Sequence, residues 1–219
     1  MQEIKTKGII LNTRDFGEAD KIATLFSIDL GKIAVKFNGV RKEKAKLKAL
    51  IQPFTFIEAE CFKRGDFYTI KTGSVINNFP KIVSDYSKTI CAYILLEIIS
   101  KILPNNKAEN EIFLLSVATL DKIEKSGHYQ ALIEFIINFE LLLGEQLNLF
   151  ATNDRVYLDK MVGDFTPTRN STCIEIDKKV FNALIEPTDN ESIQKTCLKL
   201  LNTILKLKYD VEINSFSFL

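Results

Sequence analysis

Apolar residues in the first eighty or so positions recur in short runs with the two-residue alternation that is typical of β-strands. Each run is rich in β-branched and aromatic side chains, and turns that contain glycine separate most of the runs. The runs are residues 7–14, 21–28, 32–39, 54–62 and 67–76. Five short strands in one compact segment predict a small barrel, and a five-stranded barrel is typical of the OB fold.

The spacing of apolar positions changes after Pro80. Apolar residues then recur three and four positions apart, over stretches long enough for helices. These stretches are residues 87–103, 109–125, 129–147 and 191–208. Residues 150–176 have mixed polarity and contain Gly163, Pro167 and Asn170, so we expect this region to be irregular.

Charge divides the chain at the same place. The formal net charge of the 219 residues is +1, yet residues 1–80 carry 14 basic and 9 acidic side chains, and residues 81–219 carry 15 basic and 19 acidic ones. Together with the change in periodicity, this asymmetry predicts an α+β protein. Its parts are an N-terminal five-stranded OB-fold barrel in residues 1–80 and an all-α helical domain in residues 81–219. A positive domain of this kind is expected to meet a polyanion.

The densest positive segment is KFNGVRKEKAKLKALIQPF, residues 36–54, which has six Lys or Arg residues and one acid, Glu43. It falls between the third and fourth predicted strands, where an OB fold commonly carries oligonucleotides. The predicted phosphate contacts are Lys32, Lys36, Arg41, Lys42, Lys44, Lys46 and Lys48. No pattern for reading bases is present, so we expect binding that depends little on sequence.

Aromatic residues near this segment offer a second kind of contact. Phe37, Phe67 or Tyr68 could stack on an unpaired base. The competing interpretation is a short helix over KEKAKLKALI, residues 42–51, with solvated lysines and with its apolar residues packed inward. Those inward residues would be Ala45, Leu47, Leu50 and Ile51.

Other classes of protein find little support. Cysteines 61, 91, 173 and 197 form neither CxxC pairs nor a disulfide framework, which favours a reducing cytosol. The longest apolar run, residues 90–103, contains Glu97 and Lys101 and is shorter than the roughly 20 residues of a membrane span. The first residues lack the apolar core and cleavage site of a targeting peptide. We expect a cytoplasmic protein that contacts no membrane.

Candidate catalytic groups are few. Asp15, Glu18 and Asp20 in DFGEAD resemble part of a nuclease metal site, but no second carboxylate cluster accompanies them, so we interpret them as exposed acids of a turn. The single histidine, His128, has no cysteine or serine motif that suggests a triad. No GxxxxGK[ST] or GxGxxG segment is present to cradle a nucleotide phosphate. We therefore predict no enzymatic activity and no cofactor.

Five segments of the first domain together resemble the N-terminal domain of the RecO family of bacterial recombination mediators. They are KGIIL (7–11), GEADKIATLFS (17–27), LGKIAV (30–35), NGVRKEKAKL (38–47) and LIQPF (50–54), in the order and spacing of that family. Weaker similarity continues through YILLEII (93–99) and FELLLGEQLNL (139–149) to VEINSFSFL (211–219). The resemblance also singles out Arg41 as the principal DNA contact, since a guanidinium binds phosphate in a bidentate manner.

The resemblance implies an OB-fold domain followed by a helical domain, in a cytoplasmic, nucleoid-associated protein. It also implies binding to single-stranded and double-stranded DNA and annealing of complementary strands. RecR would be a direct partner. With RecR and RecF, a protein of this family helps RecA replace SSB on single-stranded DNA.

Two departures from the family pattern affect these expectations. Many members carry a four-cysteine zinc module after the FEL helix, whereas the corresponding region here, residues 148–177, contains only Cys173. One thiol cannot form a tetrahedral structural site, so we expect no zinc. In relatives that hold the acidic tail of SSB, an Arg precedes FEL; here Ile136, Ile137 and Asn138 occupy those positions.

The SSB tail would thus meet less positive charge here, although Lys122 and Lys125 could compensate from a neighbouring helix. We expect RecR binding to be retained and direct binding of SSB to be weak or lost. The alternative to a DNA-binding mediator is a non-catalytic helical scaffold whose OB-like domain binds proteins, and a metal-dependent nuclease is a third class.

Overall fold

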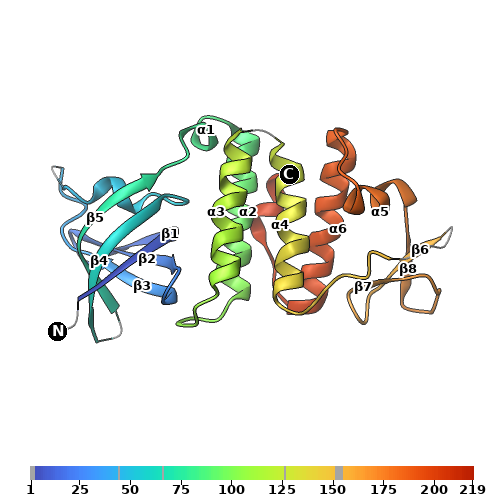
Figure 1. Cartoon of the computed structure of the whole chain (residues 1–219), viewed down its shortest axis with the longest axis horizontal. Coiled ribbons are helices and arrows are strands. Elements are labelled where there is room, and N and C mark those ends of the chain that lie inside the picture. The colour runs from blue at the N-terminus through green and yellow to red at the C-terminus, as the bar shows by residue number, and fades with distance from the viewer. Residues whose placement is uncertain (1–2, 44, 66, 126, 151–154) are drawn as a thin grey trace.

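The computed structural model describes residues 3–43, 45–65, 67–125, 127–150 and 155–219. Figure 1 shows three parts along the long axis of the molecule: a β-barrel at one end, a group of long helices in the middle, and a small sheet with a short helix at the other end. None of the helices in the described part of the chain is long and apolar enough to cross a membrane.

The barrel consists of β1 (Glu3–Phe16), β2 (Asp20–Ser27), β3 (Gly31–Phe37), β4 (Phe56–Arg64) and β5 (Phe67–Asn77). The strands close in the order β1-β2-β3-β5-β4, and β3 pairs with β5 in parallel while the other pairs are antiparallel. This is the strand arrangement of an OB fold, and the predicted five-stranded barrel is confirmed.

Side chains of alternating strand residues fill the barrel. In β3, Ile33, Val35 and Phe37 point inward and are almost fully buried, together with Leu25 of β2 and Ile57 of β4. This arrangement follows from the two-residue period of a strand, which sends every second side chain to the same face. Inward Phe37 is therefore a core residue, and the prediction that it offers an exposed face to a base is wrong.

Within the described ranges, the barrel is followed by the four-residue α1 (Pro80–Val83) and then by five longer α-helices. They are α2 (Tyr86–Ile102), α3 (Asn110–Lys125), α4 (His128–Leu142), α5 (Lys178–Ile185) and α6 (Glu191–Tyr209). Asp85 caps α2 by accepting the Lys88 amide at 3.0 Å, and Asn190 caps α6 by accepting the Ile193 amide at 3.1 Å. The four long predicted helices are present, but α4 ends five residues before position 147.

A buried ion pair joins α4 to α6. Lys208 Nζ lies 2.9 Å from Glu140 Oε2, and the two side chains are 8% and 0% exposed. The same ammonium donates a hydrogen bond to the Glu145 carbonyl at 2.8 Å. Burial raises the pKa of Glu140, and the nearby Lys208 opposes that rise.

The mixed polarity of residues 150–176 predicted an irregular region, and this prediction is partly wrong because the described part of the region contains three short strands. They are β6 (Val156–Asp159), β7 (Asp164–Thr166) and β8 (Cys173–Ile176), arranged in the order β7-β6-β8. Asp159 stabilises the connecting turns by accepting hydrogen bonds from the Met161 amide, the Asn170 amide group and the Thr172 hydroxyl at 2.7–2.9 Å. Strands of three or four residues are too short to show a period in the sequence.

The barrel packs directly on the helices. The Phe113 ring of α3 lies 5.6 Å from Phe26 and 6.0 Å from Phe56, and Tyr93 of α2 lies 5.4 Å from Phe54, all between ring centroids. A single cluster of buried apolar residues runs from the outside of the barrel through the helices to the small sheet. The barrel and the helices therefore share one hydrophobic core in addition to the core inside the barrel.

A tight polar contact reinforces this junction at the turn between β2 and β3. The Asn106 amide, in the loop between α2 and α3, donates to the Lys32 carbonyl at 2.9 Å. Gly31 has a positive φ of 68°, and a Cβ placed on it would lie 2.0 Å from the Lys107 carbonyl oxygen. Only glycine allows the chain of the turn to approach the loop this closely.

The last residues return to α2. The short helix η2 (Asn214–Phe218) is capped by Glu97, whose carboxylate accepts the amides of Asn214 at 2.9 Å and Ser215 at 2.8 Å. Lys101 Nζ lies 2.8 Å from the same carboxylate. These hydrogen bonds hold the pKa of Glu97 below its usual range, despite the opposing effect of burial.

Candidate nucleic-acid interface

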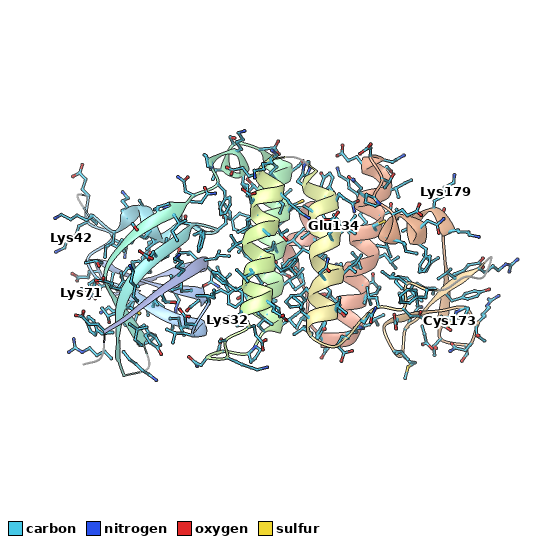
Figure 2. All side chains as sticks on the ribbon, viewed as in Figure 1. Lys32, Lys42, Lys71, Glu134, Cys173 and Lys179 are labelled. Carbon is cyan, nitrogen blue, oxygen red and sulfur yellow. The ribbon has the colours of Figure 1, made fainter. Side chains whose placement is uncertain are left out.

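Lys42, in the basic segment, lies at the end of the barrel that faces away from the helices (Figure 2). Residues 38–42 form a turn after β3, and a short 3-10 helix, η1 (Lys48–Ile51), precedes β4. Leu50 and Ile51 are buried against the barrel, whereas the predicted contacts Arg41, Lys42, Lys46 and Lys48 are exposed. Lys44 lies outside the described residues.

The two interpretations of this segment describe different parts of it. The apolar residues do pack inward, but the helix covers only the four residues of η1 rather than residues 42–51. The lysines are solvated, as both interpretations require. Their exposure leaves them available to a polyanion, so packing does not decide between surface charge and a binding role.

Arg41 is fixed to the turn between β1 and β2. Its backbone amide donates to the Ala19 carbonyl at 2.9 Å, and its Nη1 donates to the Gly17 carbonyl at 3.2 Å. Its Nη2 lies 3.4 Å from Asp15 Oδ2, and the Arg41 side chain is 40% exposed. The guanidinium is therefore oriented by the turn and still open to solvent.

Lys36, near the end of β3, contacts both an acid and an aromatic ring. Its Nζ lies 2.8 Å from Asp20 Oδ2 and 5.1 Å from the centroid of the Phe16 ring. The Gly39 amide donates to the other oxygen of Asp20 at 2.7 Å. The Lys36 ammonium and the Gly39 amide hold the pKa of Asp20 below its usual value.

An aromatic pair lies beside these cations. Phe16, at the end of β1, is 42% exposed, and its ring centroid lies 6.3 Å from that of Phe67 at the start of β5. Tyr68 is half-buried, with Lys63 Nζ 5.9 Å from its ring centroid. Phe67 and Tyr68 were predicted as base contacts, but Phe16 was not, because the sequence distinguishes Phe16 only by its place before the Gly17 turn.

Lys32 does not belong to this surface, contrary to the prediction. Its side chain lies at the junction with the helices, where its Nζ donates to the Ser100 carbonyl, and the residue is only 6% exposed. Burial lowers the pKa of this ammonium. The sequence shows that Lys32 is basic but gives no sign that α2 covers it.

Two of the three acids of DFGEAD, Asp15 and Asp20, are engaged by basic residues. Asp15 lies 3.3 Å from Lys21 Nζ and 3.4 Å from Arg41, and Asp20 binds Lys36. No group of three or more His, Cys, Asp or Glu residues that could hold a metal ion occurs within the described ranges. The described geometry therefore gives the nuclease interpretation no support.

The other chemically notable residues lie far from the barrel surface. His128 begins α4, and its ring centroid lies 4.1 Å from that of Tyr129. Cys173 is a half-buried free thiol at the start of β8, at the opposite end of the molecule from Lys42 (Figure 2). Neither residue contacts Phe16 or the described residues of the basic segment.

The positions considered for the SSB tail carry little free positive charge. Ile136 is fully buried in α4, and Asn138 donates to the Glu134 carbonyl at 2.7 Å. Lys122 lies 2.9 Å from Glu134, and Lys125 lies 2.5 Å from Asp121. Both candidate compensating lysines are thus already paired with acids of this domain.

Comparison with known proteins places both halves of the chain in one family. Residues 1–79 match the family model described as Recombination protein O N terminal, and residues 83–153 match Recombination protein O C terminal. A protein named DNA repair protein RecO from Caldanaerobacter subterraneus subsp. tengcongensis is 26% identical over 96% of this chain and 83% of its own length. One of the same name from a Thermoanaerobacter species is 28% identical with the same coverage.

Another DNA repair protein RecO, from Acetivibrio thermocellus, is 33% identical over 58% of this chain and about half of its own length, 51%. Together the two family models match well over half of the chain, in the order barrel then helices. The chain belongs to the RecO family of DNA repair and recombination proteins.

Proposed function

We propose that this protein is a non-enzymatic recombination mediator that binds single-stranded and double-stranded DNA through the end of its barrel. The observation that carries the proposal is the set of exposed cations Arg41, Lys42, Lys46 and Lys48 in the loop that follows Lys36, whose Nζ lies 5.1 Å from the centroid of the exposed Phe16 ring. A basic groove beside aromatic side chains is the usual way in which single strands are held without regard to sequence. A role on chromosomal DNA implies a cytoplasmic, nucleoid-associated protein.

Annealing follows from the kind of contacts that this surface offers. Lysine and arginine bind phosphates, and Phe16 with Phe67 would stack against the flat face of a base. Neither contact uses the hydrogen-bonding edge of the base. A strand held in this way could still pair with its complement, and the duplex that forms would be held less tightly, by its phosphates alone, because its bases no longer stack on the protein.

Binding of a fluorescently labelled oligothymidine at several salt concentrations tests the proposal. If about four cations each neutralise one phosphate, the logarithm of the affinity should fall against the logarithm of the salt concentration with a slope near −3. A flat dependence would instead favour the scaffold interpretation. Cleavage of DNA after addition of magnesium would favour a nuclease.

Arg41→Glu should weaken this binding by about tenfold or more, because it removes a charged hydrogen-bond donor and adds repulsion. Lys179→Glu is the matched control, since it makes the same change of charge on α5 at the far end of the molecule (Figure 2). Equal effects of the two variants would indicate that only net charge matters. Unchanged affinity of Arg41→Glu would remove Arg41 from the site.

The partner proposal follows from the family and from the charges of the helices. RecR would bind chiefly through the N-terminal barrel, and with RecR and RecF the protein would help load RecA onto DNA coated with SSB. The SSB tail would bind weakly, because Lys122 and Lys125 already pair with Glu134 and Asp121. Titration of RecR and of a labelled SSB-tail peptide tests both statements; a tail Kd of about 1 μM or tighter that depends on the two lysines would refute the second.

One observation favours the scaffold alternative. An apolar groove of about 610 Å³ lies between the barrel and α3, and two of its lining residues, Ile76 and Leu114, are 45% and 59% exposed. Exposed apolar surface of this kind is typical of protein contacts. If the protein bound neither DNA nor RecR, the scaffold interpretation would therefore be favoured over the mediator.

A further inference from the structure

We propose that Asp15 competes with DNA phosphate for Arg41, and that Asp20 instead holds the basic loop in the shape that binds DNA. This inference rests on the proposed function and concerns the regulation of the same surface. The two acids lie five positions apart, at either side of one turn, and both pair with a cation of the predicted interface. Their surroundings nevertheless assign them different roles.

Asp15 has the properties of a displaceable ligand. Its Oδ2 lies 3.4 Å from Arg41 Nη2 and its Oδ1 lies 3.3 Å from Lys21 Nζ, which are both long for charged hydrogen bonds. The Asp15 side chain is 55% exposed. Within the described ranges, no backbone amide donates to its carboxylate. An exposed ion pair of this kind is weak, so a phosphate can take the place of the carboxylate.

Asp20 is held more firmly. Its Oδ1 accepts the Gly39 amide at 2.7 Å, and its Oδ2 lies 2.8 Å from Lys36 Nζ. The Asp20 side chain is 27% exposed, and both contacts belong to the polypeptide that leads into the basic loop. Removing this carboxylate would free the Gly39 turn. Arg41, two residues further on, would then lose part of its orientation.

The carboxylate of Asp15 resembles phosphate in charge and in the geometry that it offers to a guanidinium. In the free protein it occupies part of the donor fork of Arg41, and DNA must displace it. The cost of displacement lowers affinity without altering which sequences bind. A protein that must release a strand once it has annealed benefits from such a limit on affinity.

The test is binding of labelled oligothymidine to Asp15→Asn and to Glu18→Gln. Both changes remove one negative charge from the same turn, but Glu18 is exposed and makes no ion pair among the described residues, so it reports the effect of net charge alone. Asp15→Asn should bind about two- to fivefold more tightly than the wild type, the range that corresponds to one exposed ion pair. Glu18→Gln should show a smaller gain.

When Arg41 is replaced by Ala, the gain from Asp15→Asn should shrink to the small gain of Glu18→Gln, because the competition acts through the Arg41 side chain and only the effect of net charge is left. Asp20→Ala should bind more weakly than the wild type, with thermal melting used to confirm that it folds. A gain in Glu18→Gln equal to that of Asp15→Asn, or an Asp15→Asn gain that keeps its full size in the Arg41→Ala background, would refute the role of Asp15. Tighter binding by Asp20→Ala would refute the anchoring role of Asp20.

Failure of this inference is distinguishable from failure of the proposed function. If the wild type binds with the expected salt dependence and Arg41→Glu weakens binding, the DNA surface stands whatever Asp15→Asn does. If the wild type does not bind the oligonucleotide, both the DNA surface and its regulation are refuted.

Discussion

Replacing Gly31 by Ala should destabilise the protein far more than the same change at Gly17. Gly31 is the first residue of β3 and Gly17 lies in the turn between β1 and β2, and they have similar positive φ values of 68° and 59°, respectively. A Cβ on Gly17 would meet no atom within 4 Å, whereas a Cβ on Gly31 would lie 2.0 Å from the carbonyl oxygen of Lys107. The two variants share the backbone strain and differ in the steric overlap.

The magnitude follows from these two contributions. A left-handed conformation costs a residue with a Cβ about 1–2 kcal/mol, and both variants bear that cost. To bring the Gly31 contact to 3.0 Å, below which real Cβ contacts are essentially never found, the turn and the Lys107 loop must separate. That movement strains the hydrogen bond from the Asn106 amide to Lys32 and the packing beside it, at a further cost of about 2 kcal/mol.

Thermal unfolding of the two variants beside the wild type measures the difference. For a chain of this size, each kcal/mol corresponds to about 2–4 °C in Tm, so Gly31→Ala should melt about 4–8 °C below Gly17→Ala. Equal shifts would refute the reasoning. They would mean that the contact between the β2–β3 turn and the helical loop is relaxed without loss of stability.

Two further predictions concern the helical part. Lys208→Met should lower the free energy of unfolding by about 3–5 kcal/mol, because it leaves the Glu140 carboxylate buried without its cation. Urea denaturation measures this loss, and adding Glu140→Gln should recover much of it. An unchanged urea midpoint for Lys208→Met would contradict the prediction. Metal analysis of protein purified without chelator should find much less than one zinc per chain, because Cys173 is the single cysteine of residues 148–177. Stoichiometric zinc held by thiolates would show that residues 148–177 do not correspond to the zinc module of other family members.

The sequence predicted those features that repeat along the chain. Alternation over seven or more residues identified the five barrel strands, and helical spacing identified the four long helices. The small sheet was not predicted, because β7 has only three residues and because the sheet is stabilised by hydrogen bonds from turn residues to Asp159. Such hydrogen bonds leave no periodic pattern in the sequence. The end of α4 escaped because apolar residues continue beyond it, to Leu147.

The candidate site shows the same division. The concentration of charge located the basic loop, but charge alone does not reveal burial, and Lys32 proved to be covered by α2. The wrong prediction for Phe37 was avoidable, because Phe37 alternates in register with Ile33 and Val35 and therefore points into the barrel with them. Phe16 and the pairing of Asp15 with Arg41 depend on how two turns meet in space, which no single segment of sequence specifies.

The shared hydrophobic core also makes the molecule a rigid spacer between its two ends. Because Phe26, Phe54 and Phe113 pack the barrel onto α2 and α3, the described structure has no hinge of loosely packed residues between the barrel and the helices. A protein bound near Cys173 would therefore be held at a nearly constant distance and angle from a strand bound near Lys42 (Figure 2). Any large change in that geometry would have to come from the partner or from the DNA.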